Sequence, residues 1–84
     1  MKTLLQYLAE SIVDYPEEIA IEEKEFDGSL NLSLQVNPAD IGKIIGKEGR
    51  TIKAIKNLLH LKGILINQRV FLDLVEPDNQ SPVR

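Results

Sequence analysis

The 84-residue chain has no cysteine and a single histidine, His60. Without cysteine it forms neither disulfides nor thiolate metal sites, and one histidine supplies neither a zinc site nor a catalytic triad. No apolar run approaches the roughly 20 residues of a membrane-spanning helix. The first residues turn polar too early for a secretory signal. We therefore expect a cytoplasmic protein with no metal, no cofactor and no membrane segment.

Negative charge is in slight excess, since the net charge is −3, but its distribution is uneven. Residues 10–27 hold eight acidic residues against one lysine, whereas residues 38–62 hold six basic residues against two acidic ones. Each run could be no more than a solvated surface. The polarity nevertheless leaves room for a local anionic ligand on the basic segment.

The first half of the chain predicts one helix and a β-hairpin. Apolar residues at helical spacing predict a helix over 3–14, with Thr3 and Gln6 as a capping box and an end imposed by Pro16. Residues 18–26 are typical of a charged edge strand. Asp27-Gly28 is a strong hairpin signal, and strict alternation over residues 30–36 predicts a half-buried strand.

The second half predicts two helices and a last strand. Asn37 as a cap, Pro38 at the first position and Asp40 near the positive dipole end predict a helix that is cut short at Gly46. A second helix is predicted from Arg50 to Lys62, with Gly63 as its stop. Residues 69–74 alternate as a strand, and the polar segment 77–84 is expected to be a disordered tail after a domain over 1–76.

A loop with a glycine at each end, Gly46-Lys47-Glu48-Gly49, joins the two predicted helices. Gly46 can take a positive φ, and Gly49 has no side chain to obstruct a ligand. The loop and the following helix start present unpaired N–H groups and a positive dipole end, to which Lys47, Arg50 and Lys53 add charge. Spacing alone leaves two interpretations open: a phosphate-binding loop, or a tight helix corner with solvated lysines.

The stretch Ile45-Gly46-Lys47-Glu48-Gly49, followed by Ile52-Lys53-Ala54-Ile55, resembles the I-G-x-x-G signature of KH domains and the helix after it. The order helix, strand, strand, helix, helix, strand is similar to the bacterial, type II form of that fold. The resemblance spans residues 3–76 and is greatest to the KhpA group of small bacterial KH proteins. It implies an α+β fold in which a three-stranded mixed sheet is covered on one face by three helices.

The resemblance also implies a function, which is to hold about four unpaired nucleotides of RNA in a groove. Carried over to this sequence, the RNA-binding residues would be Ile45, Gly46, Lys47, Glu48, Gly49, Arg50 and Lys53. It suggests a post-transcriptional regulator or RNA chaperone that forms a homodimer or pairs with a Jag-type KH protein. Glu48 and the acidic first half of the chain would keep affinity modest.

Other functional interpretations fit the sequence less well than RNA binding does. Gly42 to Lys47 superficially suggests a Walker loop, but the spacing is one residue short and Glu48 replaces the magnesium-binding hydroxyl. The many carboxylates of residues 10–27 lack the burial that tunes a general acid, so no enzyme is expected. His60 is expected to be exposed, and Phe71 could stack on a base or pack at a subunit contact. The alternative function is a KH-fold module for protein assembly with little RNA binding of its own.

Overall fold

The elements of the fold follow the predicted order. The computed structural model describes residues 1–75. Its helices are α1 (Lys2–Glu10), α2 (Ile41–Ile45) and α3 (Arg50–Leu65), and its strands are β1 (Ala20–Phe26), β2 (Ser29–Gln35) and β3 (Arg69–Leu74). Short 3₁₀ turns occupy Pro16–Glu18, Pro38–Asp40 and Lys47–Gly49. The predicted tail at 77–84 lies outside the described residues, and the domain boundary at residue 76 stays a prediction.

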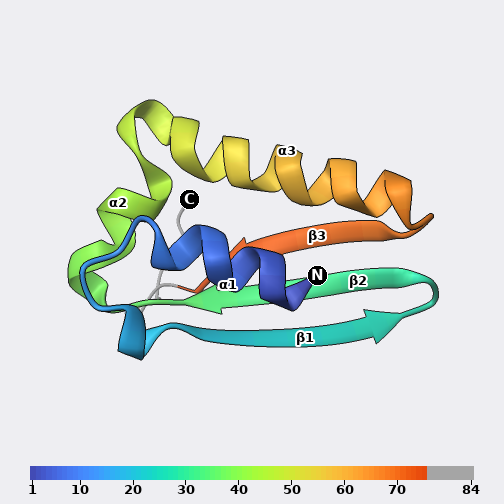
Figure 1. Cartoon of the computed structure of the whole chain (residues 1–84), viewed down its shortest axis with the longest axis horizontal. Helices are drawn as coiled ribbons and strands as arrows, with labels where there is room; N and C mark the ends of the chain where they lie inside the picture. The colour runs from blue at the N-terminus through green and yellow to red at the C-terminus, as the bar shows by residue number, and fades with distance from the viewer. Residues whose placement is uncertain (76–84) are drawn as a thin grey trace.

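The three strands form one mixed sheet with β2 in the centre. β1 pairs with β2 antiparallel, and β2 pairs with β3 parallel, so β1 and β3 are the edges. Figure 1 shows α3 running lengthwise beside β3, while α2 and the loop after it lie at the end of the molecule where α3 begins. The predicted α+β fold with a three-stranded mixed sheet is confirmed.

The core lies between the helices and one face of this sheet. On β2 the leucines 30, 32 and 34 are buried, whereas Asn31 and Gln35 between and beyond them are exposed. This period of two means that the helices cover one face of the sheet and leave the other open. The remaining buried apolar side chains come from every helix, from β3, and from the segments after α1 and β2: Leu5, Ala9, Val13, Val36, Ile44, Ile55, Leu59 and Leu72.

The hairpin between β1 and β2 turns where the sequence predicts. Asp27 and Gly28 both have positive φ, at 53° and 82°. Two successive residues of this kind define the tight turn whose twist matches that of a β-hairpin. The strand before it is shorter than predicted, because residues 16–18 form a 3₁₀ turn and β1 begins at Ala20.

The first helix is shorter than the sequence predicts and lacks the predicted capping box. Met1 is its N-cap, with no side-chain cap, and the Gln6 amide donates instead to Glu10 Oε2 at 2.9 Å. The helix ends at Glu10 rather than at Asp14. The helix does not continue because the backbone N–H of Asp14 donates to the Asp40 side chain instead of to a helical carbonyl. This partner is 26 residues away, so no local pattern reveals it.

The long helix is in turn longer than predicted, and Gly63 is inside it. α3 continues to Leu65, and the positive φ that follows belongs to Asn67, at 60°. A Cβ on Gly63 would lie 2.5 Å from the Gln68 carbonyl oxygen and 2.9 Å from Val70 Cγ2. The glycine therefore lets β3 approach the helix closely instead of ending it. No helix in residues 1–75 is long and apolar enough to cross a membrane.

Candidate nucleic-acid interface

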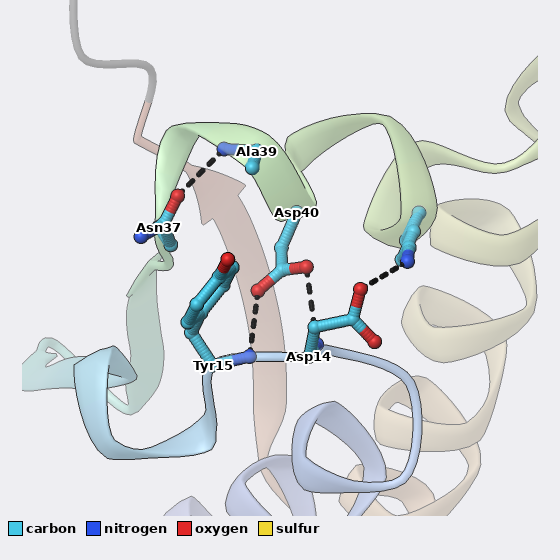
Figure 2. A network of polar contacts seen from close by, with 6 residues as sticks. Asp14, Tyr15, Asn37, Ala39 and Asp40 are labelled. Carbon is cyan, nitrogen blue, oxygen red and sulfur yellow. Dashed lines mark hydrogen bonds and ion pairs between the residues drawn. The ribbon is translucent and has the colours of Figure 1, made fainter.

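The segment that leads into the loop is capped as predicted. The Asn37 side chain accepts a hydrogen bond from the Ala39 N–H at 2.7 Å, and Pro38 takes the first position of the 3₁₀ turn (Figure 2). α2 follows directly, and Ile44 near its end is fully buried in the core. The cap fixes where the 3₁₀ turn before α2 begins, and the isoleucine fixes which side of α2 faces the core.

Asp40 holds this segment to the loop between α1 and β1. Its carboxylate is completely buried and accepts hydrogen bonds from the N–H groups of Asp14, at 3.1 Å, and Tyr15, at 3.0 Å (Figure 2). Asp14 in turn forms a hydrogen-bonded ion pair with Lys43 on α2. The hydrogen bond that the Lys43 ammonium donates to Asp14 raises the pKa of the ammonium. The sequence predicted only a helix-dipole role for Asp40, but its side chain joins two distant segments.

Gly46 is required by the turn that ends α2. Its φ of 78° and ψ of 175° lie in a region that only glycine adopts readily. A Cβ here would lie 2.1 Å from Thr51 Oγ1 and 2.5 Å from Thr51 Cβ, so the start of α3 also packs against this position. The Gly46 N–H donates to the Gly42 carbonyl at 2.8 Å. The predicted positive φ at Gly46 is confirmed.

The rest of the loop is open to solvent. Gly49 has a φ of 75°, and a Cβ added to it would meet no other atom within 4 Å. Its N–H donates to the Gly46 carbonyl at 3.1 Å. The N–H groups of Lys47 and Glu48 belong to the first turn of the 3₁₀ segment Lys47–Gly49, where a helix supplies no acceptor of its own. The bend thus places the backbone donors of two exposed residues next to the positive end of the α3 dipole.

Charged side chains surround these donors. Lys47, Glu48, Arg50 and Lys53 are all exposed, and Lys53 lies one helical turn beyond Arg50. One Arg50 nitrogen lies 3.4 Å from Glu48 Oε1, an exposed pair that is weak in water. The Arg50 guanidinium remains available to a stronger anion, because a phosphate can form two parallel hydrogen bonds with it.

The predicted site residues come together at this end of the molecule. Ile45, Gly46 and Gly49 are half-buried and form the base of the bend, and the charged residues project from it. Ile45 and Ile52 keep partial exposure, so either can contact a base. Ile44 cannot, since none of its surface is exposed.

A groove lies along α3 beyond the loop and begins at Lys56. Its walls are α3, from Lys56 to His60, and the edge strand β3, from Val70 to Asp73, and its volume is about 440 Å³. Sequence reasoning missed the α3 wall, although a signal exists: Lys53, Lys56 and His60 recur at helical spacing. His60 is exposed as predicted, and it also borders the groove.

Comparisons with known proteins agree with the class that this fold defines. The model of the KhpA/KhpB KH domain matches residues 2–73. A structure of a variant of Aquifex aeolicus Era bound to GDP.AlF4- shares the fold with a TM-score of 0.61, at 20% identity, over 84% of this chain and 28% of Era. The chain is thus a KH domain of the α+β type.

Relatives define the family within this class. The RNA-binding protein KhpA of Chlamydia pneumoniae is 47% identical over 76 residues, which is 90% of this chain and 97% of the relative. The proteins of the same name from Oceanobacillus iheyensis and Halalkalibacterium halodurans are 41% and 38% identical, over 89% and 90% of this chain and all of each relative. The chain belongs to the KhpA/KhpB KH-domain family, whose members here are named as RNA-binding proteins and not as enzymes.

Proposed function

We propose that this protein binds short single-stranded RNA, with the RNA backbone held at the loop Gly46–Gly49 and its bases in the groove between α3 and β3. The observation that carries the proposal is the exposed bend at Lys47 and Glu48, whose backbone N–H groups lie just before the start of α3. Backbone donors at a helix N-terminus are well suited to phosphate. The names of the relatives support RNA as the ligand.

Each part of the site has a distinct task in this proposal. The N–H groups of Lys47 and Glu48 and the side chains of Lys47 and Arg50 contact one phosphate, and Lys53 contacts the next. The absence of a side chain at Gly49 lets the backbone of the RNA approach closely. Partly exposed Ile45 and Ile52 offer apolar contact to bases, which then extend along the groove for about four nucleotides.

Charge sets the expected strength of binding. The cations at the start of α3 attract phosphate, but Glu48 lies among them and β1 carries several exposed acids. RNA is therefore attracted to the loop and repelled by the acidic side chains, so affinity is modest and falls with added salt. For two to four phosphate contacts on a single strand, the log–log slope is about −1.5 to −3.

The direct experiment replaces both middle residues of the loop with aspartate. In the variant Lys47→Asp/Glu48→Asp, two acids face the phosphate position, so binding of a labelled four-nucleotide RNA is lost. Circular dichroism checks that the fold survives, as expected for exposed loop residues. The matched control is Lys62→Asp, which makes the same change in net charge near the other end of α3 and keeps binding. A folded double variant that retains the RNA would refute the site.

The proposal extends to assembly. On α3, Leu58, Leu61 and Leu65 recur at helical spacing and are 47%, 58% and 78% exposed. Leucines this exposed on one side of a helix are typical of a contact surface. We assign the stripe to a second copy of this chain, with a Jag-type KH protein as the other candidate. Two joined grooves would bind RNA far more tightly than one, through effective concentration.

Analytical ultracentrifugation tests this assembly. The wild type should sediment as a dimer, and Leu61→Glu should sediment as a folded monomer, because a charge then replaces an apolar contact. Addition of a Jag-type protein distinguishes the second candidate. A wild-type monomer, alone and in that mixture, would contradict the assembly. In the cell, the proposed role is that of a cytoplasmic post-transcriptional regulator or RNA chaperone.

A second candidate function is a KH-fold assembly module with little RNA binding. The exposed stripe on α3 favours it, since that stripe has no role in the RNA groove. The salt dependence of RNA binding discriminates between the two functions. A slope near zero, or no measurable binding at low salt, would favour the assembly module, whereas the slope given above favours the RNA-binding protein.

A further inference from the structure

The sheet face opposite the helices carries both phenylalanines of the chain. Phe26 on β1 is 75% exposed, and Phe71 on β3 is 52% exposed. In the register, Phe26 pairs with Ser29 and Phe71 pairs with Asn31, and both of these β2 residues alternate with the buried leucines. Both rings therefore lie on the open face of the sheet, where no helix covers them.

Each ring shares its row of the sheet with a cation. Phe26, Ser29 and Arg69 form one row, and Lys24, Asn31 and Phe71 form the next. We call these six residues the open-face platform. It contains two aromatic rings, two cations and two small polar side chains, and no acid. The following row carries Glu22 and Asp73, so the platform is limited to the end of the sheet near the hairpin.

The platform is continuous with the proposed RNA groove. Phe71 contributes to the wall of the groove along α3. Arg69 and Phe71 also line a smaller hollow of about 250 Å³ together with His60. Both hollows lie at the β3 edge, which separates the groove from the open face. A strand that leaves the groove beside His60 thus reaches the platform by crossing one edge strand.

We propose that the open-face platform is a second contact surface for the same RNA strand, on which bases stack against Phe71 and Phe26 while Arg69 and Lys24 contact phosphates. Aromatic rings bind single strands in this way with little dependence on sequence, because every base has a π-face. The two phenylalanine Cα positions are about 12 Å apart by strand geometry, so each ring takes its own base. The inference rests on the proposed function, since the strand continues from the groove.

The composition of the platform favours RNA over a protein partner. The core of a protein–protein interface is usually apolar and depleted of charge. Here, cations and polar side chains separate the two rings, so no continuous apolar patch forms. Cations interleaved with aromatics match instead the phosphates and bases of a single strand.

Affinity for RNAs of different length tests the platform. Fluorescein-labelled oligoadenylates of four and ten nucleotides are titrated with protein, and binding is followed by anisotropy. The informative variant is Phe26→Leu, which keeps an apolar strand residue but removes the ring, at a position remote from the groove. Affinity for the ten-nucleotide RNA should fall about fivefold or more, as expected for loss of one stacked base. Affinity for the four-nucleotide RNA should not change.

The control is Tyr7→Leu, which removes a 67% exposed aromatic ring from α1, outside the platform, and should change neither affinity. A longer RNA also offers more binding registers, so the variants are compared on the same RNA. If Phe26→Leu leaves the ten-nucleotide affinity unchanged, the platform is refuted. If it alters only sedimentation, the face belongs to a protein contact and the proposal is equally refuted.

Failure of the platform and failure of the groove are distinguishable. Retention of both RNAs by the folded variant Lys47→Asp/Glu48→Asp contradicts the groove. Loss of both RNAs in that variant, together with insensitivity to Phe26→Leu, contradicts the platform alone.

Discussion

The two glycines of the loop should differ sharply when each is replaced by alanine. Gly46→Ala places a Cβ in a backbone region that costs on the order of 1–3 kcal/mol for a residue other than glycine. The same Cβ would lie 2.1 Å from Thr51 Oγ1, and moving the start of α3 aside costs about 1–3 kcal/mol more. The Cβ of Gly49→Ala would contact no other atom within 4 Å. The only cost in stability is that of the left-handed φ, about 1 kcal/mol.

Urea unfolding followed by circular dichroism measures this difference. Gly46→Ala should lower the free energy of unfolding by about 2–6 kcal/mol, a large part of the 5–15 kcal/mol typical of a domain. Gly49→Ala should remain well folded, yet weaken RNA binding more than its small loss of stability suggests, because its methyl group faces the ligand side. An equal or larger loss of stability at Gly49 would refute this account of the loop.

Three further predictions concern the scaffold. Asp40→Asn should lower the free energy of unfolding by about 1–3 kcal/mol in urea titrations, because the Asp14 and Tyr15 N–H groups bond to different carboxylate oxygens and the amide replaces one of these acceptors with an NH₂ donor; wild-type stability would contradict the buried junction. Gly63→Ala should destabilise, although alanine normally favours helices, since its Cβ would lie 2.5 Å from the Gln68 carbonyl; a gain in urea midpoint would refute the close approach. The pKa of Lys43 is raised, so its pairing with Asp14 stabilises the fold fully below the usual lysine pKa of 10.5. This stabilisation is lost as pH rises through the higher pKa of the folded protein. NMR titration of the lysine side chain should show the raised pKa in the wild type and its disappearance in Asp14→Asn.

Local rules account for the parts of the fold that the sequence predicts well. Asp27-Gly28 turns the chain because both residues tolerate positive φ, and Asn37 caps because its side chain reaches an N–H two residues on. Gly46 ends α2 for a similarly local reason. For these features, interactions among a few neighbouring residues decide the local structure, so the sequence pattern predicts the element.

The errors arise where a distant partner decides. Asp40 accepts hydrogen bonds from N–H groups 25 and 26 residues before it, and this contact ends α1 earlier than its apolar spacing suggests. Gly63 resembles a helix stop, but its role is set by β3, which packs against it later in the chain. The groove wall on α3 was likewise missed because its other side is a strand remote in sequence. Tertiary contacts of this kind override local propensity.

The same division holds for the candidate site. The bend, its glycines and its cations could be predicted from one continuous stretch, residues 45–53. The backbone donors of Lys47 and Glu48 follow from that stretch as well, because a bend between two helices leaves donors without helical partners. The open-face platform could not be predicted in this way, since it combines three strands whose register only the folded sheet defines.

Amide chemical shifts during an RNA titration test the central claim most directly. A ¹⁵N-labelled protein titrated with a short single-stranded RNA should show its largest shift changes at the N–H groups of Lys47 and Glu48, with smaller changes along α3 through Lys53. Hydrogen bonding of these loop donors to phosphate would produce this pattern. Unchanged loop amides, in a titration where other residues respond to the RNA, would contradict the account.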